Sequence, residues 1–102
     1  MANDDAYSVI DPIIHAWSKA HSLKMFSSFG GRSERFCYIS SHRGECFQIA
    51  IQPPQDAKVR VDAWSVETLD DRELHQEWVS EVTELQNALE SALAQVHEWL
   101  GE

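Results

Sequence analysis

Two cysteines and five histidines are the residues of this chain best suited to chemistry. A thiol beside an imidazole can act as a nucleophile with its base, and Cys46 with His42 or His75 would make such a pair. No neighbouring motif orients these groups, so we interpret the thiols as packing residues and predict a protein that is not an enzyme. His75 and Glu77 alternate along one expected strand face with the spacing of metal ligands, but the sequence offers no third or fourth ligand. We therefore predict no catalytic residue, no metal site and no cofactor.

The elements that would position these residues centre on two alternating segments, 46–51 and 58–66. Alternation of apolar and polar residues is typical of strands that bury one face. Pro53 and Pro54 cannot donate ladder hydrogen bonds, so we expect them to form the turn, with Ile51 opposite Val59. The apolar face of this hairpin would consist of Phe47, Ile49, Ile51, Val59, Val61 and Ala63.

A preceding strand is expected over 35–40, joined to the first segment through Gly44 in a left-handed conformation. A four-residue loop over 41–44 would pair Tyr38 with Phe47 and place Phe36 on the apolar face. A three-residue loop would send Phe36 and Tyr38 to the opposite face, and we prefer the four-residue loop because it buries them.

The same register determines what the two cysteines can do. It makes Cys37 and Cys46 diagonal neighbours about 7–8 Å apart at the backbone. This separation is at or beyond the usual limit for a disulfide. We therefore predict two free thiols, as is usual in the reducing cytoplasm.

Helices are expected at both ends of the sheet. Asp11 and Pro12 fit an N-cap and the first position of a helix of about ten residues. A short edge strand would follow over 23–28. Apolar residues then recur every three or four positions to the end of the chain, which a helix from about residue 71 would satisfy, but such a helix would be about 45 Å long.

Residues 72–82 are therefore ambiguous between strand and helix. A second capping pattern at 83–86 favours a strand over about 73–79 and a separate helix over 84–100. The expected fold class is α+β in a single domain over 1–102. It has an N-terminal helix, an antiparallel sheet of three to five strands in a meander, and a long C-terminal helix packed on one sheet face.

Charge is distributed unevenly along the 102 residues, whose formal net charge is −9. Acids and bases balance over 1–66, so the whole net charge lies in 67–102. This region repels nucleic acid and anionic membranes and would attract a basic protein. A solvated helix face that keeps the chain in solution is the alternative interpretation. The acidic start of the chain does not resemble a signal peptide, and no apolar run approaches the length of about 20 residues that spans a bilayer, so we predict a cytoplasmic location.

The second face of the expected sheet mixes polar and apolar side chains: Cys37, Ile39, Cys46, Gln48, Ala50, Arg60, Asp62 and Trp64. Tryptophan and arginine are enriched in protein interfaces, and an exposed patch of this kind would serve a foreign partner or a homodimer. Alternatively, the first helix covers this face and buries Ile13 and Trp17 against Trp64.

No motif identifies a family, so two hypotheses rest on charge and composition. The first is a non-enzymatic module that binds and occupies a basic protein, as an immunity protein, an antitoxin or a chaperone does. Its candidate contact residues are Ile39, Arg60, Asp62, Trp64, Glu73, Glu77 and Glu81. The alternative is a small-molecule pocket between sheet and helices, lined by Trp17, Phe36, Tyr38 and Trp99.

Overall fold

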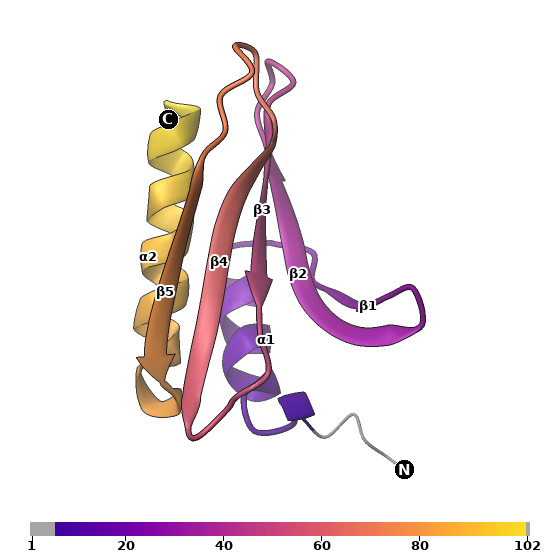
Figure 1. Cartoon of the computed structure of the whole chain (residues 1–102), viewed down its shortest axis with the longest axis vertical. Coiled ribbons are helices and arrows are strands. Elements are labelled where there is room, and N and C mark those ends of the chain that lie inside the picture. Colours follow the sequence, from indigo (N-terminus) through magenta and orange to yellow (C-terminus); the bar gives the residue numbers. More distant parts are fainter. Residues whose placement is uncertain (1–5, 102) are drawn as a thin grey trace.

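The computed structural model describes residues 6–101 and shows one antiparallel sheet with a helix at each end of the chain (Figure 1). The elements are α1 (Asp11–Ala20), β1 (Phe26–Phe29), β2 (Arg32–Ser40), β3 (Cys46–Ile51), β4 (Lys58–Glu67), β5 (His75–Glu81), a short 3₁₀ turn η2 (Val82–Glu84) and α2 (Leu85–Leu100). The strands follow the chain in the order β1-β2-β3-β4-β5. The predicted α+β class, the meander and the long C-terminal helix are confirmed.

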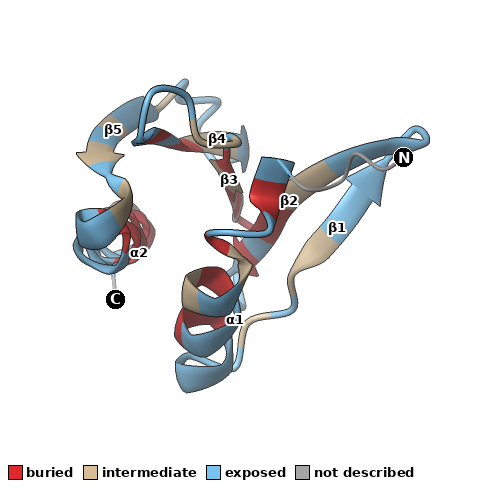
Figure 2. Cartoon of the chain, turned by 90° about the horizontal axis from the view of Figure 1, so that it is seen from below, coloured by how far each residue is buried: buried red, intermediate tan, exposed pale blue. Residues whose placement is uncertain are grey.

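Both helices pack on the same face of the sheet (Figure 2). Helix α1 contributes Ile14 and Trp17 to the core, and Trp17 is only 1% exposed. His21, the C-cap of α1, places its Nε2 at 3.0 Å from a carboxylate oxygen of Glu90 in α2 and so links the two helices. The expectation that the first helix might cover the second face, with Trp17 against Trp64, is therefore wrong.

Helix α1 begins one residue earlier than its sequence suggests. Ile10 is the N-cap, and Asp11 is already the first helical residue. The carboxylate of Asp11 accepts two hydrogen bonds from Arg35 of β2, at 2.8 and 3.0 Å, instead of capping the helix. Pro12 still lies in the first turn, where its missing N–H costs nothing. The helix is thereby fixed to the sheet at its first residue.

The β2–β3 hairpin has the three-residue loop that we did not prefer. The Ser41 N–H donates to the Glu45 carbonyl at 2.9 Å, and the loop between them contains Gly44 with φ = +95°. A three-residue hairpin loop with a left-handed glycine is a common connection. Strand β2 is consequently shifted by one residue from the expected register, with Ile39 opposite Phe47.

This shift exchanges the two faces of β2. Cys37 and Ile39 point into the core at 0% and 8% exposure, whereas Phe36 and Tyr38 lie on the opposite face. Cys37 and Cys46 are no longer diagonal neighbours on one face, and both thiols are free.

The β3–β4 hairpin turns at Asp56 and Ala57, not at the two prolines. Both residues have positive φ, +53° and +65°, and Gln55 and Lys58 exchange hydrogen bonds of 2.8 and 2.9 Å around them. Two central residues with positive φ form the mirror-image turn that suits a twisted hairpin. The register places Ile51 opposite Val61, two residues from the expected pairing. A shift of two preserves the faces, so the predicted apolar face remains the core.

Residues 72–82 are resolved in favour of the strand. β5 pairs with β4 without interruption from Lys58–Glu81 to Trp64–His75, and η2 then leads into α2. Within residues 6–101, no helix is long and apolar enough to cross a membrane. Because α2 packs beneath β4 and β5, residues 67–101 of the acidic third gather at the β4–β5 edge of the sheet.

Candidate functional site: the open face of the sheet

One face of the sheet is covered by neither helix, and we call it the open face. It consists of Phe36 and Tyr38 of β2, Gln48 and Ala50 of β3, Arg60, Asp62 and Trp64 of β4, and His75, Glu77 and Val79 of β5. Strand pairing sets these residues in rows across the sheet, because residues directly opposite each other share a face. One row runs Tyr38, Gln48, Trp64 and His75, and the next runs Phe36, Ala50, Asp62 and Glu77.

Four aromatic rings gather at the β1–β2 side of this face, and we call Phe26, Phe29, Phe36 and Tyr38 the aromatic group. The Phe26 and Phe36 rings stack with centroids 5.2 Å apart, and Tyr38 meets Phe36 edge-on at 5.7 Å. Phe29 is 65% exposed and Tyr38 is 44% exposed. Phe36 itself is only 8% exposed beneath the other rings. The four rings lie outside the buried core cluster, so core packing does not account for the exposed surface of Phe29 and Tyr38.

A hollow of about 300 Å³ lies beside the aromatic group. Its apolar lining comes from four strands: Phe29 of β1, Phe36 and Tyr38 of β2, Ala50 of β3 and Trp64 of β4. Gln48, Gln52, Arg32 and Glu34 supply hydrogen-bonding groups at its margin. Apolar walls with a few polar groups are the usual composition of a site that accepts a side chain or a small ligand.

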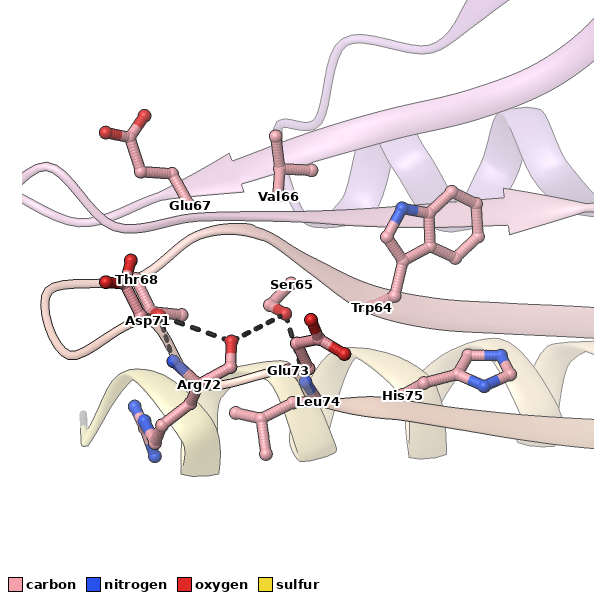
Figure 3. A pocket seen from close by; sticks show the side chains of 10 residues that line it. All are labelled: Trp64, Ser65, Val66, Glu67, Thr68, Asp71, Arg72, Glu73, Leu74 and His75. Atoms are coloured by element: carbon pink, nitrogen blue, oxygen red, sulfur yellow. Dashed lines mark hydrogen bonds between the residues drawn. The ribbon is translucent and has the colours of Figure 1, made fainter.

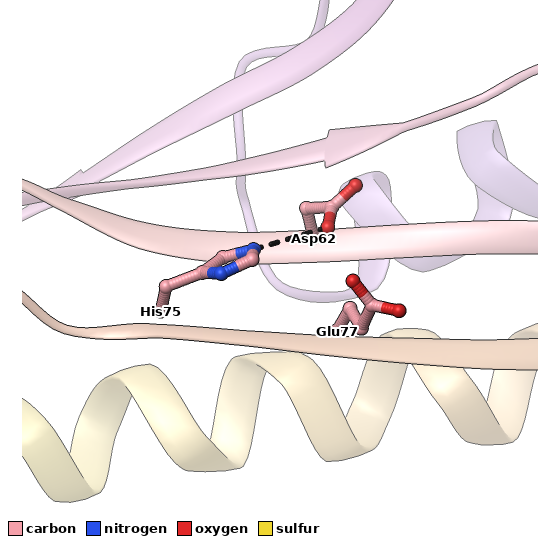
Figure 4. Close-up of side chains that lie close together, drawn as sticks. All are labelled: Asp62, His75 and Glu77. Atoms are coloured by element: carbon pink, nitrogen blue, oxygen red, sulfur yellow. Dashed lines mark hydrogen bonds and ion pairs between the residues drawn. The ribbon is translucent and has the colours of Figure 1, made fainter.

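Charged side chains gather at the opposite, β4–β5 side of the open face, and we call Arg60, Asp62, His75 and Glu77 the ionic cluster. Figure 4 shows Asp62, His75 and Glu77 of this cluster. Asp62 is 5% exposed and accepts hydrogen bonds from Arg60 Nε at 3.2 Å and from His75 Nε2 at 3.2 Å. Arg60 Nη2 also pairs with Glu77 at 2.8 Å. These contacts satisfy a carboxylate that would be costly to bury alone.

The cluster supplies the third ligand that the sequence did not reveal for His75 and Glu77. One donor atom from each of Asp62, His75 and Glu77 lies within 4.8 Å of the others, because Asp62 is directly opposite Glu77 across the sheet. Carboxylates with an imidazole are suitable ligands for a divalent cation. Here, however, the Arg60 guanidinium already pairs with both carboxylates, so a cation would have to compete with it.

A larger hollow of about 750 Å³ is bounded by the β4–β5 loop, next to the open face (Figure 3). Four of its lining residues, Ser65, Thr68, Arg72 and Leu74, are hydrogen-bonded to one another. Ser65 Oγ accepts from the Leu74 N–H at 3.0 Å and donates to the Arg72 carbonyl at 3.2 Å, while the Arg72 N–H donates to Thr68 Oγ1 at 2.8 Å. These bonds close the loop upon itself. We interpret the hollow as the inside of a turn and not as a binding site.

The predicted contact residues divide between the two faces. Arg60, Asp62 and Trp64 lie together on the open face, and Glu77 extends that surface along β5. Glu81 follows on the same face of β5, opposite Lys58, and Glu73 borders the β4–β5 loop hollow.

Ile39 and the predicted pocket are corrected by the structure. Ile39 is 8% exposed in the core, because the three-residue loop turns it inward. Trp17 is buried in the core, and Trp99 stacks on Phe47 with ring centroids 5.4 Å apart. Both lie on the helix side of the sheet, away from Phe36 and Tyr38 on the open face. The four aromatic residues therefore do not line one cavity.

Sequence reasoning missed the part that β1 plays. Phe26 and Phe29 join the aromatic group because β1 folds back on β2 with Phe26 opposite Phe36. Their separation of three residues fits neither side of an alternating strand, and the register shift between Phe26 and Ser28 explains why both reach Phe36. The Phe-x-x-Phe spacing is present in the sequence, but it places both rings against Phe36 only because the strand contains this irregularity, which the sequence does not indicate.

Glu45 was missed as well. It is 4% exposed and pairs with Arg43 at 3.0 Å and with Arg72 at 3.6 Å. Arg43 also donates to the carbonyl of Leu100, the last residue of α2. This group joins the β2–β3 loop, the β4–β5 loop and the C-terminus of α2, where a cation is favourable.

Cys46, the thiol that the sequence set beside His42 or His75, donates to the Phe47 carbonyl at 3.9 Å, and Cys37 lies in the core. Burial raises the pKa of the Cys37 thiol to about 12, despite a backbone hydrogen bond from Ile49 that lowers it. The imidazole of His75 bonds with Asp62. Cys37 therefore remains a protonated thiol at neutral pH, and such a thiol is a weak nucleophile.

Comparison of the chain with protein family models, curated proteins and solved structures found no match. The open face must therefore be interpreted from its own geometry and charge.

Proposed function

We propose that this protein is a non-enzymatic protein-binding module of the cytoplasm that acts by occupying a basic partner, in the manner of an immunity protein, an antitoxin or a chaperone. The observation that carries the proposal is the uncovered sheet face with aromatic rings on one side and a buried, paired carboxylate on the other. Tyrosine, tryptophan and arginine are the residues most enriched in interface hot spots. Tyr38, Trp64 and Arg60 are all present on this face.

The charge of the chain supports a basic partner. The net charge of −9 falls in residues 67–102, which include β5 and α2. Glu77 and Glu81 extend this acidic region to the margin of the open face. Exposed acids of this kind accelerate encounter with a positively charged protein and make the association sensitive to salt.

The aromatic hollow supports an apolar anchor in the same contact. Its volume of about 300 Å³ suits one large apolar side chain of a partner. Trp64 and Tyr38 lie on either side of Gln48 in the same row, so an inserted side chain would contact both rings. Fully desolvated anchors of this kind supply most of the binding energy in protein interfaces.

Affinity capture with matched variants tests the proposal. The immobilised chain is compared with the Trp64→Ala and Tyr38→Ala variants, and with a Val9→Ala control that truncates an apolar side chain of 65% exposure two residues before α1. We expect a basic protein to be retained by the unmodified chain and by the control, to be lost from both open-face variants, and to elute at high salt. Equal retention by all four chains, or retention indifferent to salt, would contradict the proposal.

A further inference from the structure

The two edge strands of the sheet differ in how they are protected. β1 spans only Phe26–Phe29, and its pairing with β2 is broken by a register shift. Short length and bulges are common protections against unwanted strand pairing. β5 spans seven residues, pairs with β4 alone among the described strands, and has neither a bulge nor a proline. β5 is therefore the regular edge to which another strand could add.

The hydrogen bonds of β5 show which backbone groups are available. The Ser65 N–H donates to the Leu74 carbonyl at 2.9 Å, and the Val82 N–H donates to the Ala57 carbonyl at 3.1 Å. Residues alternate in an antiparallel pair, so the even-numbered residues of β5 bond toward β4. The N–H and C=O groups of the odd-numbered residues, 75 to 81, point toward the outer edge. Helix α2 lies beneath β5 on the other face of the sheet (Figure 2).

The side chains of these same outward-bonding residues lie on the open face. Val79 is 59% exposed at the middle of the edge, with Glu77 and Glu81 two residues away on either side. Side chains directly opposite each other on paired strands interact most strongly. An added strand would therefore place an apolar residue against Val79 and its neighbours two positions away against the two glutamates.

We infer that β5 binds its partner by strand addition, an inference that rests on the proposed function. The added strand would carry an apolar residue with lysine or arginine two residues away on either side. Opposite charges across the strands favour such a segment. A second copy of this chain is a poorer occupant, because the register that sets Val79 against Val79 also sets Glu77 against Glu81. Both copies would also bring the acidic third of a chain with net charge −9 to the same place.

Peptide titration on the ¹⁵N-labelled chain tests this inference. The probe is a nine-residue, end-blocked peptide with a central valine and lysines two residues to either side, and its control has glutamates in place of the lysines. We expect the lysine peptide to slow hydrogen exchange of the amides of Glu77, Val79 and Glu81. The glutamate peptide is expected to bind at least about tenfold more weakly, since attraction at two cross-strand pairs becomes repulsion.

Two variants separate backbone pairing from side-chain contact. Val79→Pro removes an outward N–H without removing a hydrogen bond to β4. It is expected to weaken binding of the lysine peptide at least about tenfold. Val79→Ala keeps that N–H and should weaken binding of the lysine peptide by only about threefold. If Val79→Pro does not fold, the double variant Glu77→Gln and Glu81→Gln takes its place, with an expected loss of affinity of about fivefold.

Several outcomes would overturn the inference. The inference is wrong if the two peptides bind equally, or if amide exchange at the β5 edge does not change when peptide is added. It is also wrong if exchange there slows with rising protein concentration in the absence of peptide, because a second copy of the chain would then occupy the edge. The result is distinguishable from failure of the proposed function. If peptides fail while Trp64→Ala still abolishes capture, strand addition is wrong and the open face stands; if capture survives Trp64→Ala, the proposed function itself is wrong.

Discussion

Truncation of two adjacent residues of β2 decides which of its faces is buried. Ile39 is 8% exposed and faces Phe47, which is fully buried. Ile39→Ala removes three carbons from a packed core, worth about 0.8 kcal/mol each, and leaves a cavity, so the expected loss is about 3 kcal/mol. Tyr38 is 44% exposed and touches the Phe26 and Phe36 rings edge-on, so Tyr38→Ala is expected to cost only about 1 kcal/mol.

The assay is equilibrium unfolding in urea, followed by circular dichroism and by tryptophan fluorescence. In both variants the free energy of unfolding should depend on urea concentration with the same slope as in the unmodified chain, and only the midpoint urea concentration should change. The four-residue loop would give the reverse order, because it buries Tyr38 opposite Phe47 and turns Ile39 outward. If Tyr38→Ala proves more destabilising than Ile39→Ala, the three-residue loop is refuted, and with it the aromatic group on the open face.

Three further perturbations test other parts of the structure. Because the pKa of Cys37 rises from 9.0 in the unfolded chain to about 12 in the fold, its stabilisation is complete below pH 9 and is lost toward pH 12. The free energy of unfolding, measured in urea at rising pH, should therefore fall by up to about 1.4 kcal/mol per pH unit above pH 9. Cys37→Ala should reduce this fall, and the same pH dependence in the variant would argue against the burial of Cys37. Glu45→Gln weakens a buried pair with Arg43 and should cost about 1–3 kcal/mol in the same assay at neutral pH and low salt, whereas no loss would indicate that the pair is not formed. Val79→Pro should lower the free energy of unfolding by less than about 1 kcal/mol and Ser80→Pro by more than about 3 kcal/mol, and equal losses would contradict the alternation of hydrogen bonds along β5.

The order of elements was predictable because their signals are local. Alternation over 46–51 marks β3, and Pro12 with the helical spacing of Ile14 and Trp17 marks α1. The strand or helix ambiguity at 72–82 was resolved correctly from the second capping pattern, although the side chains of that pattern make no cap bond and a 3₁₀ turn begins the helix instead. Patterns that extend over a whole element are robust to the details of its ends.

Registers and faces were less predictable because they depend on loops of a few residues. The β2–β3 loop is one residue shorter than expected, and a register shift of one residue moves every side chain of β2 to the opposite face. Tyr38 therefore lies on the open face, where Ile39 was expected. The burial of aromatic residues was given more weight than the favourable geometry of a three-residue loop. At Asp56 and Ala57 the turn requires positive φ at an alanine, which composition does not suggest. The ionic cluster needs residues 62 and 77 in exact opposition, and that depends on the same kind of information.

The size of the chain explains why one sheet face is left open. A helix with its side chains is about 10 Å wide, and neighbouring strands are about 4.8 Å apart, so two helices cover about 20 Å of a five-stranded sheet about 24 Å across. The two helices here can therefore cover one face only, and they do so side by side. Folding accounts for Trp17 and Trp99 on that face, but it does not require the exposed ring of Tyr38 or the half-buried ring of Trp64 on the other. Tyr38 and Trp64 could be replaced by threonine with little loss of core packing, and their presence opposite the helices is the reason to look for a partner there.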